Sequence, residues 1–107
     1  MEMHQLRYFA KVAELANVTR AAEACHVSQP SLSQQIAKLE RELGQPLFER
    51  LGRGVRLTEA GRRFKRYTDQ ILSLTEDALT QVKSRGSSGK SNRWAPWAVH
   101  STPIIIT

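Results

Sequence analysis

Apolar residues along the first 43 positions recur at steps of three and four, the spacing of residues on one face of an α-helix. The pattern predicts a first helix over about residues 4–16, a short second helix from Thr19 to about Cys25, and a third over about 29–43. The buried stripe expected on the third helix consists of Leu32, Ile36, Leu39 and Leu43. Each of these short helices therefore has one face to bury.

The polar residues between these helices have the chemistry of helix ends. Thr19 and Ser28 each carry a hydroxyl that can accept from the free backbone N–H groups of a first helical turn. Pro30 fits near the start of the third helix, where its missing N–H costs little. Gly44 permits the left-handed conformation that commonly ends a helix. Residues 26–27 are left as the tight turn between the second and third helices.

Residues 47–51 and 55–57 have the pattern of two short strands around the loop Gly52-Arg53-Gly54. This predicts a hairpin with an arginine at its tip. Thr58 then has the position of an N-cap for a long helix through about residue 85. At about 1.5 Å per residue such a helix spans on the order of 40 Å, which is too long to pack wholly on so small a domain.

The apolar residues of this long helix form a heptad pattern. Its members are Phe64, Tyr67, Ile71, Leu74 and Ala78. The helix either docks on its own core or pairs with the same helix of a second chain. Because the pattern continues beyond the expected edge of the domain, we favour a homodimer through this helix.

The outward face of the third helix carries small polar side chains where Lys and Glu would be usual. These residues are Gln29, Pro30, Ser31, Ser33, Gln34 and Gln35. Uncharged hydrogen-bonding groups of this size allow another molecule to come close. Such a face is either merely solvated or suited to the edges of DNA bases. Its position after a capped tight turn and beside a basic cluster favours DNA.

The positive charge of the chain is concentrated in one segment. The chain has 107 residues, 40% of them hydrophobic, with a formal net charge of +6 and a pI near 10.1. Seven basic residues and one acidic residue fall within positions 50–66. This concentration is typical of phosphate binding rather than of a general solubilising surface. The single cysteine, Cys25, excludes an internal disulfide and a thiolate pair for a metal, and we expect it to be a buried apolar side chain.

A helix, a turn and a second helix followed by a basic hairpin predict a mainly α winged helix-turn-helix: three helices, a two-stranded wing and a long linker helix. In such domains the second helix of the motif enters the major groove. We expect four residues to read bases: Gln29, Pro30, Ser33 and Gln34. Six others suit the DNA backbone: Thr19, Ser28, Ser31, Gln35, Lys38 and Arg50. Arg53 at the wing tip suits the minor groove, and Gln35 has the alternative of bridging helices inside the protein.

Five blocks of sequence closely resemble the LysR-type transcriptional regulators. They are VTRAA (18–22), VSQPSLS (27–33), LERELG (39–44), PLFER (46–50) and LTEAG (57–61). The resemblance covers residues 1 to about 86. It implies a DNA-binding domain over 1–58 with its helix-turn-helix at about 18–37, and a linker helix over 59–86 that pairs two chains. It also implies a bacterial protein that binds an interrupted palindrome in double-stranded DNA. Because the N-terminal residues show no apolar signal core, we expect this protein in the cytoplasm, associated with the nucleoid.

Residues 87–107 do not fit this pattern. A flexible run over 86–89 leads into a segment that we expect to be unstructured and to resemble nothing in the family. Family members continue into a ligand-sensing domain, so the sequence predicts a regulator truncated before that domain. A frameshift just after the linker is our hypothesis for the cause, and the coding DNA in the +1 frame tests it.

Two functions compete at this point. The leading one is a sequence-specific, dimeric DNA-binding regulator. The other is an interaction fragment that forms heterodimers with intact family members as a dominant negative, or a non-functional remnant. An enzyme is disfavoured, because the three histidines lie in unrelated segments and no nucleophile or paired carboxylates are placed for catalysis. The sequence predicts no cofactor, no metal site and no membrane segment.

Overall fold

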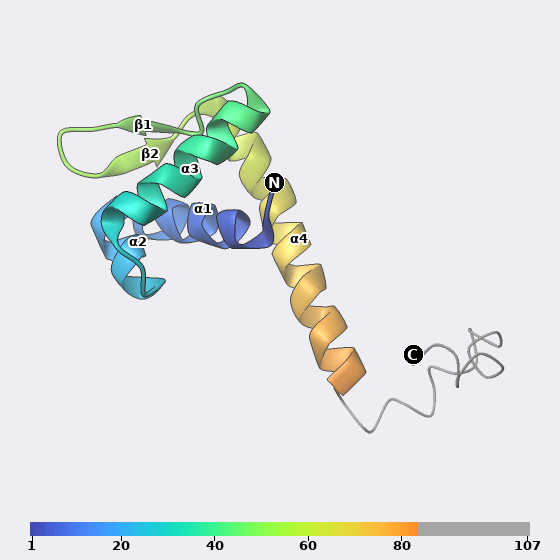
Figure 1. Cartoon of the computed structure of the whole chain (residues 1–107). Coiled ribbons are helices and arrows are strands. Elements are labelled where there is room, and N and C mark those ends of the chain that lie inside the picture. The colour runs from blue at the N-terminus through green and yellow to red at the C-terminus, as the bar shows by residue number, and fades with distance from the viewer. Residues whose placement is uncertain (84–107) are drawn as a thin grey trace, which may run out of the picture. The chain divides into compact units, whose positions relative to one another are not determined.

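The computed structural model describes residues 1–83 (Figure 1). The chain divides into two units, Met1–Leu72 and Ser73–Thr107, with the boundary inside the last helix. The expected end of that helix near residue 85 and the segment 87–107 lie outside the described residues. The elements in order are α1 (Met3–Leu15), α2 (Val18–Ala24), α3 (Gln29–Leu43), β1 (Phe48–Arg50), β2 (Val55–Leu57) and α4 (Glu59–Lys83).

The helix boundaries agree with the sequence pattern, and one cap differs. Ser28 caps α3 by accepting from the backbone N–H of Ser31 at 3.2 Å, and Gly44 ends it at φ 72°. The expected cap of α2, Thr19, is wrong. Asn17 takes this role and accepts from the backbone N–H of Arg20 at 2.8 Å. Asparagine is among the best N-cap residues, so α2 begins one residue before Thr19 and includes it.

Two buried clusters hold α1, α2 and α3 together. One contains Val12, Ala21, Ala22, Leu32 and Val55. The other contains Phe9, Ile36, Leu39 and Leu47. Two expectations need correction: Leu43 is 37% exposed, and Cys25 is only half-buried. Leu43 is the last residue of α3.

The two strands pair antiparallel, with Arg50 opposite Val55 and Phe48 opposite Leu57. β1 is shorter than the expected 47–51. The backbone N–H of Leu47 donates to the Glu40 carboxylate at 2.7 Å, and that of Leu51 donates to the loop carbonyl of Gly54 at 3.1 Å. The same carboxylate oxygen accepts from the N–H of Phe48 at 3.3 Å. Glu40 thereby fixes the start of the hairpin to α3.

The junction between the hairpin and α4 is closely packed. The Thr58 hydroxyl donates to the carbonyl of Pro46 at 2.7 Å and accepts from the N–H of Gly61 at 2.9 Å, so the expected N-cap is confirmed. Gly61 is buried against the carbonyl of Leu47 so closely that a Cβ would collide with it. The first turn of α4 therefore belongs to the same packed unit as the wing.

Candidate nucleic-acid interface

The first turns of α3 present a polar face opposite its buried stripe. Pro30, Ser31, Gln34 and Lys38 are exposed on this face, whereas Leu32, Ile36 and Leu39 are buried. Within residues 1–83 the Gln34 side chain has no hydrogen-bond partner, so its amide is free to turn toward a bound ligand. This part of α3 offers an apolar ring, a hydroxyl, an amide and an ammonium group.

The two other expected base readers, Gln29 and Ser33, are hydrogen-bonded to each other. Nε2 of Gln29 donates to Oγ of Ser33 at 2.9 Å, and both side chains are half-buried. One amide hydrogen bond is thus used inside the protein, while the Gln29 carbonyl and the Ser33 hydroxyl hydrogen remain. The bond limits the rotamers of both residues and so orders this part of the face.

Gln35 bridges α1 and α3, the alternative role considered for it. Its Oε1 accepts from Nε2 of the buried Gln5 at 3.0 Å, and it lies 3.2 Å from Nε2 of His4. The sequence interpretation missed Gln5. The available signal was Glu2 followed three residues later by Gln5, the spacing of a capping box. Oε1 of Gln5 accepts from the backbone N–H of Glu2 at 2.9 Å.

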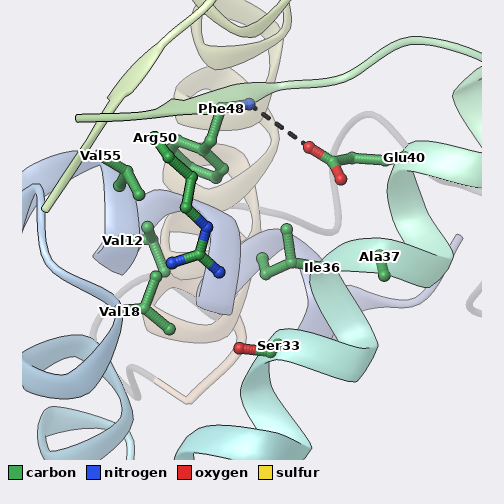
Figure 2. Close-up of a pocket in the computed structure, with 9 residues that line it drawn as sticks. All are labelled: Val12, Val18, Ser33, Ile36, Ala37, Glu40, Phe48, Arg50 and Val55. Atoms are coloured by element: carbon green, nitrogen blue, oxygen red, sulfur yellow. Dashed lines mark hydrogen bonds between the residues drawn. The ribbon is translucent and has the colours of Figure 1, made fainter. Parts of the chain in front are cut away.

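Arg50 reaches from β1 over a hollow of about 320 Å³ between the wing and α3. Figure 2 shows its guanidinium between Val18 of α2 and Ile36 of α3, with Ser33 below it. The carboxylate of Glu40 lines the same hollow and is bonded to β1. The Arg50 guanidinium has no acidic partner among the described residues.

A second hollow, of about 160 Å³, lies beside the first and is mostly polar. Thr19, Gln29 and Arg50 all line it, together with Gly52 and Gly54 of the wing loop. The structure therefore brings together residues from α2, α3 and β1 that the sequence could only place on separate elements. Their hydroxyl, amide and guanidinium groups can all donate to an anion.

The wing is fixed to the domain at its base and exposed at its tip. The N–H of Val55 donates to the carbonyl of Ala16 at 3.1 Å, and the N–H of Leu51 donates to the carbonyl of Gly54 at 3.1 Å. Gly54 has φ 76° and lies directly against the Ala16 carbonyl. Arg53 lies in the loop between β1 and β2 and is exposed.

The basic segment divides into paired and unpaired side chains. Arg56 pairs with Glu49 across the wing at 2.8 Å, and Arg62 and Lys65 pair with acidic neighbours on α4. Within residues 1–83, four arginines of this segment form no ion pair: Arg50, Arg53, Arg63 and Arg66. Arg50 and Arg53 lie on the wing, so the wing carries two cations that no internal carboxylate neutralises.

The heptad residues of α4 do not share one environment. Phe64 is half-buried and its ring lies 5.1 Å from that of Phe9. Its contacts belong to the core of its own domain, the alternative considered for this helix. By contrast, Tyr67 is 64% exposed and Leu74 is 67% exposed. Ile71 is half-buried and Ala78 is exposed.

The family model that matches this chain describes the bacterial regulatory helix-turn-helix proteins of the lysR family and covers residues 3–62. The chain belongs to this family. The winged helix-turn-helix fold expected from the sequence is confirmed, and family membership places the chain among transcriptional regulators rather than enzymes.

Curated relatives support the same assignment. The HTH-type transcriptional regulator BudR of Raoultella terrigena is 55% identical over 91 residues, which cover 83% of this chain and 31% of BudR. YwqM of Bacillus subtilis strain 168 is 49% identical over 109 aligned residues, which cover 99% of this chain and 37% of YwqM. The chain thus spans about a third of the length of these two relatives. The YwqM alignment extends into residues 87–107, so our expectation that this segment resembles nothing in the family is wrong.

Two solved structures similar to this chain are complexes with DNA. CbnR_DBD bound to DNA superposes with a TM-score of 0.73 and 42% identity, over 78% of this chain and 95% of CbnR_DBD. BenM_DBD bound to the catB site 1 DNA gives a TM-score of 0.76 and 41% identity, over 84% of this chain and 96% of that one. Among residues 1–83, no helix has the length and apolarity needed to cross a bilayer.

Proposed function

We propose that this chain binds double-stranded DNA in a sequence-specific manner, with the first turns of α3 in the major groove and the wing beside it. The observation that carries the proposal is the likeness, at 41–42% identity, to two domains solved on DNA. The exposed polar face of α3 next to two unpaired wing arginines supports it independently. A regulator that binds bacterial DNA in this way acts in the cytoplasm, at the nucleoid.

The proposed base contacts follow from the chemistry of the face. The free amide of Gln34 can pair with N6 and N7 of adenine, and Pro30 can touch the methyl group of thymine. Gln29 and Ser33 act as a pair, because the bond between them holds both side chains beside the groove edge. A good bidentate contact is worth about 1–3 kcal/mol of discrimination against the wrong base.

The proposed phosphate contacts surround this face. Thr19, Ser28, Ser31, Gln35 and Lys38 offer donors along α2 and α3, and Arg50 offers a guanidinium between those helices. Arg53 is the residue for the minor groove, where a narrow A·T tract has the most negative potential. Phosphate contacts position the domain and make its affinity depend on salt.

We further propose that two chains pair through α4 and present two copies of α3 to an interrupted palindrome. Tyr67 and Leu74 support this, because both are large side chains with more than 60% of their surface exposed within one chain. The same surface would pair this chain with another family member. Co-expression of the tagged chain with an untagged full-length relative, followed by affinity purification through the tag, measures the ratio of homodimers to heterodimers.

In vitro selection from a random duplex pool, using the purified chain, tests the proposed function. We expect a logo with two related half-sites at a fixed spacing, and binding to the selected duplex about a thousandfold tighter than to a scrambled one. Equal affinity for both duplexes would refute sequence-specific binding. A selected logo with one half-site would refute the proposed dimer alone.

A further inference from the structure

We propose that the amide of Gln35 is locked with its NH2 group outward, as a donor to a DNA phosphate, by a hydrogen-bond relay that begins at the backbone of Glu2 and passes through Gln5. The inference rests on the proposed function and extends it. It gives Gln35 both of the roles considered from the sequence, one for each end of its amide. Gln5 acts as a positioning residue, since it works through Gln35.

The direction of the relay is set by a group that can only donate. The backbone N–H of Glu2 lies 2.9 Å from Oε1 of Gln5, so the oxygen of that amide must face it. Nε2 of Gln5 then faces α3 and donates to Oε1 of Gln35 at 3.0 Å. Gln5 is 4% exposed, so reversing its amide would leave its buried NH2 group facing the Glu2 N–H and its oxygen facing that of Gln35.

A second donor reinforces the same orientation. Nε2 of His4 lies 3.2 Å from Oε1 of Gln35, and with its proton on that nitrogen it occupies the other lone pair of the oxygen. The carbonyl end of the Gln35 amide is then saturated inside the protein. Its NH2 group keeps two donors and has no hydrogen-bond partner within residues 1–83.

The neighbours of Gln35 on the surface of α3 indicate which class of ligand its NH2 group binds. Ser31, Gln35 and Lys38 follow one another at steps of four and three, so they share a face of the helix. Ser31 and Lys38 are exposed and flank the half-buried Gln35. A hydroxyl, an outward NH2 and an ammonium group form a row of donors. Phosphate oxygens only accept, and a phosphodiester of the DNA backbone matches this row.

Affinity measurements on four variants test the relay, using the full chain with a C-terminal tag and the selected duplex. Gln35→Ala removes the donor, and a hydrogen bond to a charged group predicts a loss of about ten- to a hundredfold. Gln5→Glu keeps the acceptor for the Glu2 N–H but has no donor for Gln35, so it turns the Gln35 oxygen outward. We expect a loss at least as large as for Gln35→Ala. Gln5→Met removes the relay without reversing it, and we expect a loss of only a few-fold.

The fourth variant shows whether Gln5 acts through Gln35. In the double variant Gln5→Glu with Gln35→Ala, we expect the same affinity as for Gln35→Ala alone, because no amide is left to reverse. Additive losses would overturn the relay. Circular dichroism and thermal unfolding of every variant identify losses that come from misfolding, and Gln5→Met gives the stability cost of an altered residue at this buried site.

Two further readouts separate a neutral phosphate donor from a structural role. A duplex scanned with methylphosphonates should weaken wild-type binding at one phosphate where Gln35→Ala shows no further loss. Gln35→Ala should also leave the slope of log affinity against log salt unchanged, whereas Lys38→Ala should lower it by about one.

Unchanged affinity of Gln35→Ala on a duplex that the wild type binds specifically would overturn this inference and leave the proposed function intact. Failure of the wild type to prefer any duplex would overturn both.

Discussion

Helices α3 and α4 are both amphipathic, yet only α4 leaves several large apolar side chains exposed. The start of α3 exposes Pro30, Ser31 and Gln34, which are small or uncharged polar groups. α4 exposes Leu74 at 67% and Val82 at 83%. The exposed side chains of a helix therefore indicate which kind of partner it suits. Hydrogen-bonding groups suit base edges, and large apolar groups suit another protein helix.

The two helices also differ in how their outer side chains are supported. Gln29 is bonded to Ser33, and Gln35 is bonded to α1, so the face of α3 that we propose for DNA recognition is ordered by contacts within the protein. Such preorganisation lowers the entropy lost on binding. The exposed apolar side chains of α4 gain order and lose contact with water only when a partner covers them.

The largest expected effect comes from adding charge to the exposed apolar face of α4. Leu74→Glu with Ala78→Glu places charges in the proposed dimer seam, and we expect the dimer to dissociate. Affinity for a duplex with two half-sites then falls by about a hundredfold, because the linkage between the two domains is lost. Affinity for one half-site stays unchanged. Sedimentation equilibrium and titrations with both duplexes measure this.

The matched control for that variant is Ser73→Glu with Thr80→Glu, which adds the same charge to exposed positions outside the heptad pattern. If both double variants remain dimeric, or both dissociate, the seam is not the interface. If the variant Leu74→Glu with Ala78→Glu is a monomer yet binds the duplex with two half-sites as tightly as the wild type does, dimerisation makes no contribution to affinity.

The next effect concerns the unpartnered amide on α3. Gln34→Ala should cost about 1–3 kcal/mol at the base that Gln34 reads and little at other bases, because one bidentate contact is lost. Repeating the binding-site selection on the variant shows which position of the half-site loses its preference. Gln45→Ala, an exposed glutamine beyond the end of α3, is the control. An unchanged logo for Gln34→Ala would remove this residue from base readout.

A smaller and less selective effect is expected on the wing. Arg53→Ala should weaken binding by about tenfold across all sequences and lower the salt slope by about one, since one cation leaves the interface. Arg56→Ala is the matched control, because its guanidinium is already paired with Glu49. Titrations over a range of salt concentrations compare the two. Equal slopes for Arg53→Ala and the wild type would place Arg53 away from the DNA.

The smallest effects concern the caps of the two helices. Ser28→Ala removes the hydroxyl that accepts from Ser31, which costs about 1 kcal/mol of folding free energy. Thr58→Ala should cost more, because its hydroxyl also donates to the carbonyl of Pro46. Urea unfolding measures the free energy of both variants. A larger loss for Ser28→Ala would contradict the hydrogen bonds assigned to Thr58.

The sequence predicted the elements well because their signals are local. Helical periodicity located α1 and α3, and cap residues such as Ser28, Gly44 and Thr58 marked the ends of helices. Periodicity also separates the buried face of a helix from its outer face. The misassigned cap of α2 shows the limit of this reasoning. Asn17 and Thr19 are both acceptable cap residues, and only the backbone conformation at Asn17 decides between them.

Contacts between elements were harder to predict, because they depend on how the helices cross. Glu40 looks like an ordinary surface residue of α3, yet it accepts two backbone N–H groups of the hairpin. Gln5 would be expected in water, and it is buried between helices. Phe64 fits a heptad, but its neighbour is Phe9 of the same domain. In each case helical periodicity indicated the face of the helix on which the residue lies, but only the tertiary packing determined which residue it contacts.

The attachment of the wing to Ala16 has a thermodynamic consequence. The loop between β1 and β2 is closed by its own backbone bond and held to the end of α1 by the N–H of Val55. In the proposed complex, Arg53 therefore approaches the duplex on a loop whose shape was determined during folding. A calorimetric comparison with a regulator that uses a disordered arm should show a smaller heat-capacity change for this chain, because no coupled folding accompanies its entry into the groove.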